Sequence, residues 1–509
     1  MPPTPSQFER VGERRFTIAL IVLAVLVRLF RLGYQSLWVD EMLTLAVSTP
    51  EEGLNIWSYL QYNVHGPLHS AVVYLFQLVS RNDAWLRLPS AAAGVAGVVY
   101  MYRWTRWWLT PSLARVAALM LAVHPLHVYY SQELRNYAFL LFFALLSCHH
   151  FHRLLEGGRA RNHVAYVLGM TCAALSNFTA AFLFLAHTIM FIARHRFDRR
   201  PLLRWLVMAV AILVLISPWV YRIHTYIDIK RLVTPVAPGE LEDAERLRGA
   251  TTFSWLSVPY TMYTYSVGFS LGPSTRELHQ RHDLSSVFRG HWLEVCWVVV
   301  LFGVVGLMGL RTAVRNRLRW RELCLYLLVP IACTLVLNWQ NAKPFNVRYV
   351  LLGFPAFVCL LAAGLGGLGK WVGKAAALAV LATLVVSTGN YYFNGRYARD
   401  DVKRATGYVE RRIADGECIF APTVANIVAR YATRNDPILG VYQRAWTPKE
   451  RVDAQMSRLF AGCNAFWYVR ARPWVDDADG YVWDQISSRY RQVEVANFDG
   501  VTVIHFERK

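Results

Sequence analysis

The sequence predicts a mainly α-helical membrane protein with many spans and a small α/β domain at its C-terminal end. Three observations lead to this fold class. Of the 509 residues, 55% are hydrophobic and only 17% are charged, whereas soluble domains carry about a quarter charged residues. Long apolar runs recur up to residue 390, and basic residues gather in the short gaps between them. The remaining residues show mixed helix and strand patterns, so disorder and a fibrous structure are excluded.

Eleven apolar runs are candidate membrane spans, because a spanning helix needs about 17–25 mostly apolar residues. Residues 67–80 are apolar but too short to span, so we expect a helix along the outer membrane surface. Counting them as a span would invert every later loop. The predicted spans are about 16–32, 88–105, 112–129, 137–153, 163–177, 178–193, 203–221, 291–310, 322–338, 348–367 and 375–390.

The distribution of charge predicts the orientation of these spans. The net charge is +20, and residues 391–509 hold 18 Lys+Arg against 15 Asp+Glu, so most of the excess lies in residues 1–390. Short basic loops face the cytoplasm. A cytoplasmic N-terminus then places loops 33–87 and 222–290 outside, together with residues 391–509. A nucleic-acid partner is not expected, because the basic residues follow the loops rather than one folded face.

The two larger outer segments have different patterns. Loop 222–290 shows no strong helix or strand and is expected to cover the site or an acceptor, since long loops of this kind are often functional. The C-terminal segment has no nucleophile motif, phosphate loop or metal spacing, so we interpret it as an outer domain that stabilises the protein or presents an acceptor. Its predicted helices are 399–413 and 449–460, and its predicted strands are 417–422, 465–472, 494–498 and 501–506.

Six of the eight cysteines lie in the apolar runs and are interpreted as small buried hydrophobic residues. Cys418 and Cys463 lie in the C-terminal domain instead. A disulfide between them is compatible with an oxidising compartment. Spacing gives no distance between the two residues, and the unpaired state is the favoured interpretation.

The segment SLWVDE, residues 36–41, follows the first span and carries two adjacent acids. Carboxylates at a lipid–water boundary are costly unless they are solvated or paired. Asp40 is a candidate general base, because a hydroxyl or amine that attacks a sugar carbon must lose a proton. Glu41 could orient that base, bind the acceptor or hold a divalent cation. The alternative is an acid pair that is merely solvated.

Further candidates lie in the other outer segments. His65 begins HGPLH and could contact a phosphate or a metal, or be a polar residue with neither role. Glu133, Arg135 and Tyr137 lie together in HPLHVYYSQELRNYA. An arginine at this boundary can grip a phosphate with two donors, although Arg135 and Glu133 could also form a simple ion pair.

Lys343, Arg348 and Tyr349 lie in KPFNVRY, at the start of a late span. Lys and Arg side chains at a membrane interface often have no other role than to extend their charged ends toward water. Together with the preceding segments, however, they place one candidate base, several candidate phosphate-binding cations and many aromatic residues on one membrane face. A transferase that uses a lipid-phosphate sugar donor needs this combination, because cations stabilise charge on the leaving phosphate.

These motifs resemble the bacterial GT-C glycosyltransferases, in particular the ArnT-like and protein-mannosyltransferase-like branch (glycosyltransferase families 39 and 83). SLWVDE, HGPL, WLRLPSAAAG, HPLHVYYSQELRNYAFLL and RYVLLGFPAFVCLLAAGL occur in the family order, over about residues 16–390. The resemblance implies a GT-C helical bundle in the bacterial inner membrane. It also implies a polyprenyl-phosphate-linked sugar donor, a periplasmic active site and transfer with inversion.

The resemblance also assigns roles to residues. Asp40 matches the acid of the first outer loop that is taken as catalytic, and Glu41 matches its partner. His65 lies where members commonly have Lys or His. The remaining matches to polar family positions are Glu133, Arg135, Arg348 and Tyr349.

Two positions depart from the family pattern. Gly66 replaces the first residue of the usual Pro-Pro pair, and Asn177 lies near a position where many members have His. Neither departure affects Asp40. Both leave a metal site and the detailed phosphate contacts open, so a divalent metal is compatible with the sequence but no metal ligand is assigned.

The sequence therefore favours a multi-pass glycosyltransferase that moves a hexose or pentose to a glycan, lipid or protein acceptor. A transporter or flippase of lipid-linked sugars is the second hypothesis. It would be expected to show internal repeats and several ionisable residues deep in its spans, whereas Arg28 is the clearest buried charge. A membrane anchor for the C-terminal domain is the third hypothesis, and it would need far fewer spans.

Overall fold

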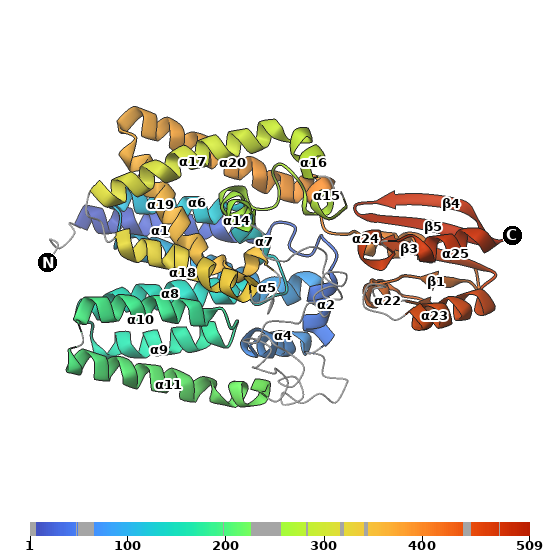
Figure 1. Cartoon of the computed structure of the whole chain (residues 1–509), viewed down its shortest axis with the longest axis horizontal. Coiled ribbons are helices and arrows are strands. Elements are labelled where there is room, and N and C mark those ends of the chain that lie inside the picture. Colours follow the sequence, from blue (N-terminus) through green and yellow to red (C-terminus); the bar gives the residue numbers. More distant parts are fainter. Residues whose placement is uncertain are drawn as a thin grey trace.

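A bundle of long helices is joined at one end to a small α/β domain, which lies at the right of Figure 1. The bundle occupies the chain up to residue 393 and the α/β domain the remainder. The computed structural model describes residues 7–46, 48, 66–196, 198–224, 256–280, 284–315, 320–339, 345–440, 449–477 and 479–509.

Every predicted apolar run overlaps a helix of the bundle, so the mainly α-helical prediction is confirmed. These helices are α1 (Gln7–Leu29), α5 (Asp83–Thr105), α6 (Pro111–Val123), α7 (Pro125–Ser131), α8 (Tyr137–Leu155), α9 (Ala160–Ala174), α10 (Ala180–His195), α11 (Arg199–His224), α17 (Trp292–Arg315), α18 (Trp320–Trp339), α19 (Phe354–Gly367) and α20 (Lys370–Phe393).

Helix length limits how many spans can be counted. Among the described residues, five helices are long and apolar enough to cross a membrane, or six if α6 and α7, which meet at a 54° bend, form one span. Ala180–His195 and Leu351–Gly367 are apolar but shorter. The number eleven therefore remains a prediction, while the membrane character of the bundle follows from its apolar helices.

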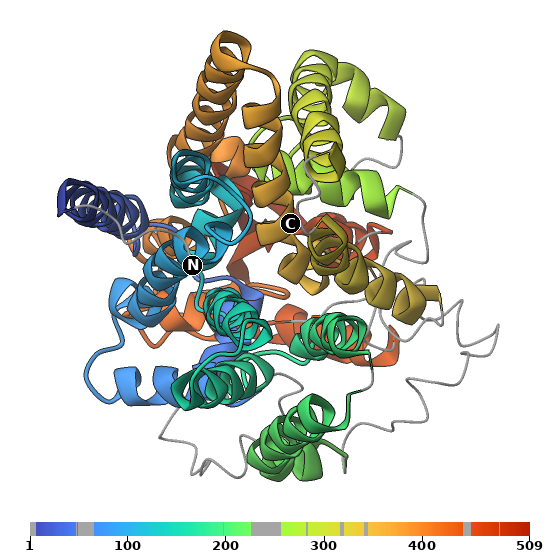
Figure 2. The same ribbon diagram turned by 90° about the vertical axis from the view of Figure 1, so that its left-hand side faces the viewer.

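Peripheral helices of the bundle expose apolar side chains, as expected for contact with lipid. Figure 2 looks along the bundle and shows α1 in dark blue and α11 in green at its edges. On α1, Val22 and Leu26 are exposed, and on α11 Leu203 and Val207 are exposed. Because water would disfavour such surfaces, these faces fit a lipid environment.

Inside the bundle, small residues allow two helices to touch. A Cβ atom on Gly309 of α17 would lie 2.0 Å from the Leu360 carbonyl oxygen of α19, and one on Gly364 would lie 1.9 Å from that of Val305. Such contacts are impossible for larger residues. Close backbone approach at small residues is a common way to pack helices in membranes.

The bend between α6 and α7 is held by buried polar groups. Pro125 begins α7, and the His124 side chain accepts the backbone N–H of Leu126 at 3.2 Å. Fully buried Arg28 of α1 donates to the Ala122 carbonyl at 3.0 Å. Arg28 therefore satisfies a carbonyl that the end of α6 leaves without a helical partner.

Shorter helices occupy the end of the bundle nearest the α/β domain. Apolar α4 matches the predicted surface helix and exposes Tyr74 and Leu75. The prediction of loop 222–290 as lacking elements is wrong for its described part, because α14 enters the core and buries Tyr265 fully. The short helices here are α2 (Val39–Ala46), α4 (Leu68–Gln77), α14 (Ser257–Val267), α15 (Thr275–Gln280), α16 (Leu284–Gly290), η2 (Val347–Tyr349), η3 (Leu351–Gly353) and η4 (Gly395–Tyr397).

The α/β domain contains a five-stranded sheet with the strand order β2-β1-β3-β5-β4. Strand β1 pairs in parallel with β2 and β3, and β5 pairs antiparallel with β3 and β4. All the predicted strands are present. The elements are α21 (Val402–Glu410), β1 (Cys418–Phe420), α22 (Ala425–Tyr431), β2 (Ile438–Leu439), α23 (Lys449–Gly462), β3 (Ala465–Ala471), α24 (Pro473–Asp476), α25 (Tyr481–Arg489), β4 (Tyr490–Phe498) and β5 (Val501–Arg508).

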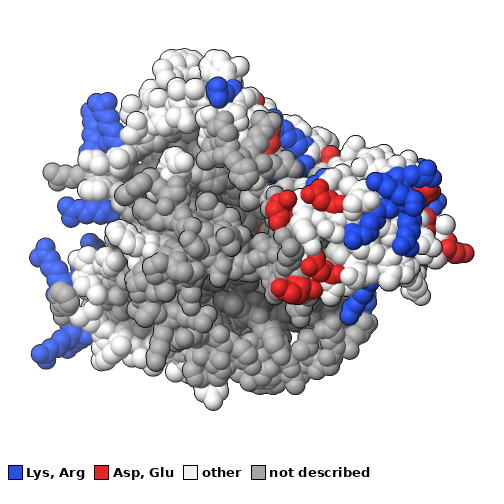
Figure 3. Space-filling model, turned by 45° about the vertical axis from the view of Figure 1, so that its right-hand side comes forward, with Lys and Arg blue, Asp and Glu red and all other residues white. Residues whose placement is uncertain are grey.

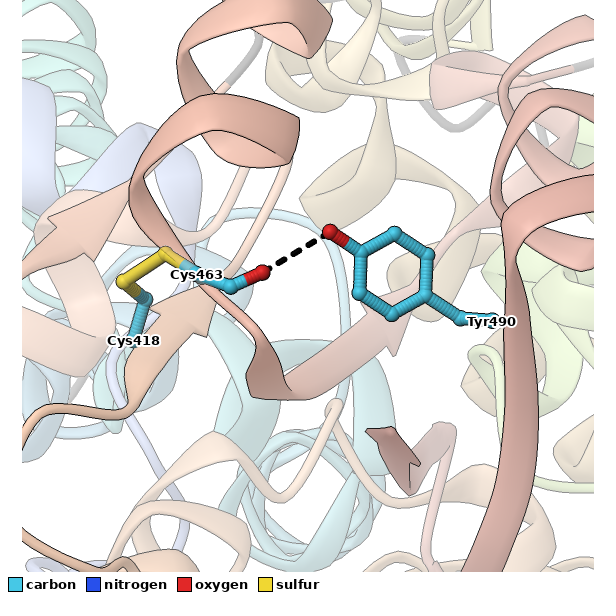
Figure 4. The surroundings of a disulfide bond; sticks show 3 residues. All are labelled: Cys418, Cys463 and Tyr490. Carbon is cyan, nitrogen blue, oxygen red and sulfur yellow. Dashed lines mark hydrogen bonds between the residues drawn. A yellow bond between two sulfur atoms is a disulfide. The ribbon is translucent and has the colours of Figure 1, made fainter. Parts of the chain in front are cut away.

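A disulfide joins Cys418 of β1 to Cys463 at the end of α23 (Figure 4). The unpaired state favoured from the sequence is therefore wrong. The two Cα atoms are 6.1 Å apart, which is within the range that a disulfide bridges. Nearby, the Tyr490 hydroxyl donates to the Cys463 carbonyl at 2.8 Å. The fold, and not the 45-residue separation, brings the two cysteines together.

Charge is distributed unevenly along the long axis of the molecule. Figure 3 shows Lys and Arg without Asp or Glu at the end of the bundle opposite the α/β domain, whereas the α/β domain carries residues of both signs. Helices α8, α10 and α17 all carry basic residues in their last turns. This is the arrangement predicted from the basic gaps between the apolar runs.

Candidate active site

The candidate site lies where α2, the α7–α8 turn and η2 meet, at the end of the bundle nearest the α/β domain (Figure 1). Arg348 of η2 donates to Asp40 Oδ2 at 2.7 Å. Arg135 donates to the Asp40 main-chain carbonyl at 3.0 Å and to Thr44 Oγ1 at 3.1 Å. Three segments that lie far apart in the sequence therefore converge on Asp40.

Access differs sharply between the two adjacent acids. Side chains of Asp40 and Arg348 are 22% and 26% exposed, so solvent reaches their ion pair. Glu41 is fully buried. Because a general base must reach a substrate proton, only the first acid has the access that this role requires.

Glu41 lies at the centre of a buried ion cluster. Arg87 of α5 donates to both carboxylate oxygens, at 2.9 and 2.7 Å, and Arg399 donates to Oε2 at 2.9 Å. The backbone N–H of Leu134 also donates to Glu41, at 2.7 Å. Burial acts to raise the pKa of Glu41, but Arg87 and Arg399 outweigh it and lower the pKa to about 2. Glu41 therefore ties four segments together as an ionised group.

Glu133 is buried in a different way. Its Oε1 accepts the indole N–H of Trp38 at 3.0 Å, and among the described residues its Oε2 has no hydrogen-bond partner. Burial raises the pKa of Glu133 to about 7, although Arg399 opposes this shift. The simple Arg135–Glu133 ion pair considered from the sequence is thus not the main contact of this carboxyl group.

Aromatic residues line the same region. The ring centroids of Tyr137 and Tyr130 are 4.9 Å apart, and the phenol of Tyr137 interacts electrostatically with Arg348 and Arg135. The Arg348 guanidinium lies 5.8 Å from the ring centroid of Tyr349. The structure therefore brings together Asp40, Glu41, Glu133, Arg135, Tyr137, Arg348 and Tyr349.

Two other predicted site residues, His65 and Lys343, lie outside the residues that the structure describes. Gly66, which follows His65, has a structural reason to be glycine. A Cβ atom there would lie 2.0 Å from the carbonyl oxygen of Leu175, and that carbonyl accepts the Leu68 N–H at 3.0 Å. The departure from Pro at this position therefore permits close contact between the start of α4 and the end of α9.

A metal site is not formed by the residues seen here. The described ranges contain no group of three or more His, Cys, Asp or Glu side chains placed to hold an ion. Arg87, Arg399 and Leu134 already occupy the carboxylate of Glu41. These donors do not fit a divalent cation at Glu41.

Asn177 is the second position that departs from the family pattern. Its side-chain oxygen accepts a hydrogen bond from the Thr179 hydroxyl.

The α/β domain contacts the segment that leads to Asp40. The Tyr431 hydroxyl accepts the Leu37 N–H at 2.9 Å and donates to Asp83 at 2.7 Å. The Ser36 hydroxyl accepts the Lys403 N–H at 2.9 Å. The domain is therefore docked beside the candidate site rather than attached only by its linker.

Trp38, Arg87 and Arg399 take part in the site but were not identified from the sequence. Each is charged or aromatic and lies in or beside a segment that the sequence predicts to be outside, so the residue types themselves were a usable signal. Their partners were not readable, because Arg399 and Glu41 are 358 residues apart. Contacts over such separations depend on the packed fold.

Residues 64–221 match the sequence model of the family described as dolichyl-phosphate-mannose-protein mannosyltransferase. No curated protein sequence is significantly similar to the chain. Among solved structures, ArnT from Cupriavidus metallidurans in the apo state is similar over 97% of this chain and 98% of its own, with 13% identity and a TM-score of 0.57.

Two further solved structures have the same architecture. ArnT from Cupriavidus metallidurans bound to undecaprenyl phosphate matches with 14% identity and a TM-score of 0.54, over 96% of this chain and 97% of its own. The oligosaccharyltransferase AglB from Archaeoglobus fulgidus, in complex with an inhibitory peptide and a dolichol-phosphate, matches with 12% identity and a TM-score of 0.53, over 98% and 74%. The chain therefore has the GT-C fold of these solved structures.

Proposed function

We propose that this protein transfers a sugar from a polyprenyl-phosphate donor to an acceptor, with Asp40 as the general base. The observation that carries the proposal is the Asp40–Arg348 pair, which sets a solvent-accessible carboxylate 2.7 Å from a guanidinium. A transferase of this kind needs a base for the acceptor and a cation for the phosphate at the same place. A transporter needs no such base.

The pair suggests how the donor would engage the site. In the structure the Asp40 carboxylate already accepts a hydrogen bond from Arg348. A donor phosphate would compete for Arg348, since guanidinium groups bind phosphates with two donors. Donor binding would thus release Asp40 in the same step that occupies Arg348.

The reaction itself is a single displacement. The acceptor hydroxyl or amine attacks the anomeric carbon, its proton passes to Asp40, and the bond between that carbon and the phosphate oxygen breaks. The electron pair of that bond leaves with the polyprenyl phosphate, whose added charge Arg348 and Arg135 stabilise. One displacement inverts the anomeric configuration. His65 and Lys343 remain predicted phosphate contacts.

The orientation in the membrane completes the proposal. The basic end of the bundle faces the cytoplasm, so the site and the α/β domain lie on the opposite, periplasmic side of a bacterial inner membrane. An undecaprenyl-phosphate complex of ArnT and a dolichol-phosphate complex of AglB support a polyprenyl donor. The acceptor is a glycan, lipid or protein, and the sugar is a hexose or pentose.

The test compares cells that carry the unchanged protein, Asp40→Asn or Asp415→Asn. Asp415 is an exposed acid of the α/β domain and serves as the matched control. We expect Asp40→Asn to lower transfer by about 10²–10⁴-fold, the usual contribution of a general base. Mass spectra of lipid extracts should show the sugar-linked polyprenyl phosphate accumulating, while one glycoconjugate loses the matching mass. Near-normal transfer by well-expressed Asp40→Asn would remove Asp40 as the base.

A further inference from the structure

The linker between the bundle and the α/β domain crosses the segment that carries Asp40. Helix α20 ends at Phe393, and α21 begins at Val402. Residues 399–403, which we call the strap, run from this linker into the first turn of α21 and contact residues 35–41 repeatedly. The Arg399 N–H donates to Gln35 Oε1 at 3.3 Å, and the Lys403 N–H donates to Ser36 Oγ at 2.9 Å.

Arg399 is the residue of the strap that reaches the ion cluster. Its side chain is 7% exposed, and it donates to Glu41 Oε2 at 2.9 Å. Its guanidinium also lies 5.0 Å from the ring centroid of Tyr129. Arg87 holds the same carboxylate from α5. Glu41 is therefore held between two guanidinium groups, of which one belongs to the bundle and the other to the linker.

The α/β domain fixes the strap from its other side. Asp400 accepts from Arg472, which follows β3, at 2.6 Å, and from Arg276 of α15 at 3.4 Å. The Asp401 N–H donates to the Asp499 carbonyl at 2.7 Å. The Arg472 guanidinium lies 5.6 Å from the ring centroid of Trp38. The position of Arg399 thus depends on how the domain is docked.

We propose that the α/β domain contributes to the transferase site through Arg399. Arg399 acts as a positioning residue, because it holds Glu41 and thereby the first turn of α2 in place. Glu41 and Asp40 are neighbours in that turn. A shift of Glu41 therefore moves Asp40 relative to Arg348 and Arg135. This inference rests on the proposed transferase function and adds a role for the domain, which the sequence suggested only as a stabilising or acceptor-presenting unit.

The effect should appear in turnover rather than in donor affinity. Among the described residues, Arg399 makes its hydrogen bonds to Gln35 and Glu41 and its ring contact to Tyr129, so it acts through them and not through the Asp40 carboxylate. Misplacing a catalytic group by about 1 Å can cost on the order of 10²-fold in rate. A residue that only supports folding would instead lower the amount of active protein and leave the turnover of the folded fraction unchanged.

The experiment uses the purified full-length chain with the polyprenyl-phosphate sugar that the cell test identifies. It compares Arg399→Met, Arg399→Lys and Arg434→Met. Arg434 belongs to the same domain and forms exposed ion pairs with Asp415 and Asp436, so it is the matched control. We expect kcat of folded Arg399→Met to fall by about 10- to 100-fold with the donor KM little changed. Lys should restore part of the loss, and Arg434→Met should match the unchanged protein.

A second variant covers the case in which Arg399→Met does not accumulate in folded form. Tyr431→Phe removes the hydroxyl that joins the domain to Leu37 and Asp83 without touching Arg399. We expect several-fold lower kcat at unchanged donor KM. Unchanged kcat in folded Arg399→Met, or in Tyr431→Phe if the first variant fails to fold, overturns the inference. If the unchanged protein itself performs no transfer, the proposed function fails instead.

Discussion

Two buried polar clusters in this bundle are built from different chemistry. The cluster around Glu41, close to the α/β domain, consists of one carboxylate and two guanidinium groups. The other, near the opposite end, links His152, Tyr166, His187 and Tyr326 of four helices through hydrogen bonds of 3.1–3.2 Å. Imidazole and phenol groups can make such bonds without a net charge, and the Glu322 carboxylate, 3.6 Å from His152, is partly exposed, whereas the carboxylate of the first cluster is fully buried with two guanidinium groups.

This difference distinguishes the Glu41 cluster, which lies at the candidate active site, from the His–Tyr chain, which supports the packing of the helices. Helix α8 runs from Tyr137 at the candidate site to His152 near the other cluster, a rise of about 22 Å. Buried ions are costly and are retained mostly where they serve a function. The His–Tyr chain needs no such explanation, because satisfied hydrogen bonds between helices are ordinary in bundles. Function is therefore expected to depend on the first cluster and stability on both.

Breaking the ion cluster should have the largest effect on stability. Arg87→Met leaves Glu41 buried with one guanidinium instead of two. We expect the free energy of unfolding to fall by about 3–5 kcal/mol, the usual cost of breaking a buried ion pair. Denaturant unfolding in detergent would measure it, with Arg434→Met as the exposed-pair control at about 0–1 kcal/mol. A loss of less than 1 kcal/mol in Arg87→Met would contradict the prediction.

Glu133 should make the free energy of unfolding depend on pH. Its pKa in the folded protein is about 7, above the ordinary value of 4.5, because it is buried. Between these two values the folded state holds a proton that the unfolded state has released. Stability therefore falls as pH rises from about 4.5 to 7, by at most about 3 kcal/mol.

Glu133→Gln should remove this part of the pH dependence, since the amide does not titrate. Unfolding midpoints of both proteins between pH 4.5 and 8 would show it. The loss of stability below pH 4.5 should remain in the variant, because there the unfolded chain takes up a proton at Glu41 that the folded protein binds only at its lowered pKa of about 2. Parallel curves for the two proteins from pH 4.5 to 7 would show that Glu133 is not the titrating group.

The smallest effect is expected in the His–Tyr chain. His187→Phe removes two hydrogen bonds, to Tyr166 and Tyr326, while a ring still stacks on Phe151. We expect the free energy of unfolding to fall by about 1–3 kcal/mol, with kcat for transfer unchanged. Unfolding and turnover are measured on the same preparation. A fall in kcat comparable to that of Arg399→Met would show that the His–Tyr chain also affects transfer. The two clusters would then not differ in function.

Sequence patterns predicted the helices well because apolar runs and basic gaps are local. They also singled out Asp40, Arg135 and Arg348 as candidates, because each lies in a short polar segment between apolar runs. They did not predict Arg87 or Arg399 as partners of Glu41, nor the Cys418–Cys463 disulfide. Those contacts depend on distances that only the packed fold determines. Helix α14 of loop 222–290 was missed because its apolar residues show no clear helical periodicity, and α15 and α16 are too short to show one.

The strap also has a consequence for biosynthesis. Glu41 emerges from the ribosome 358 residues before Arg399, and the strap is fixed by Arg472 and Asp499, which are made later still. The ion cluster around Glu41 can therefore close only when the chain is almost complete. A nascent or truncated protein would have its helices in the membrane but no complete site. Such a protein would therefore not consume lipid-linked sugar before its synthesis is finished.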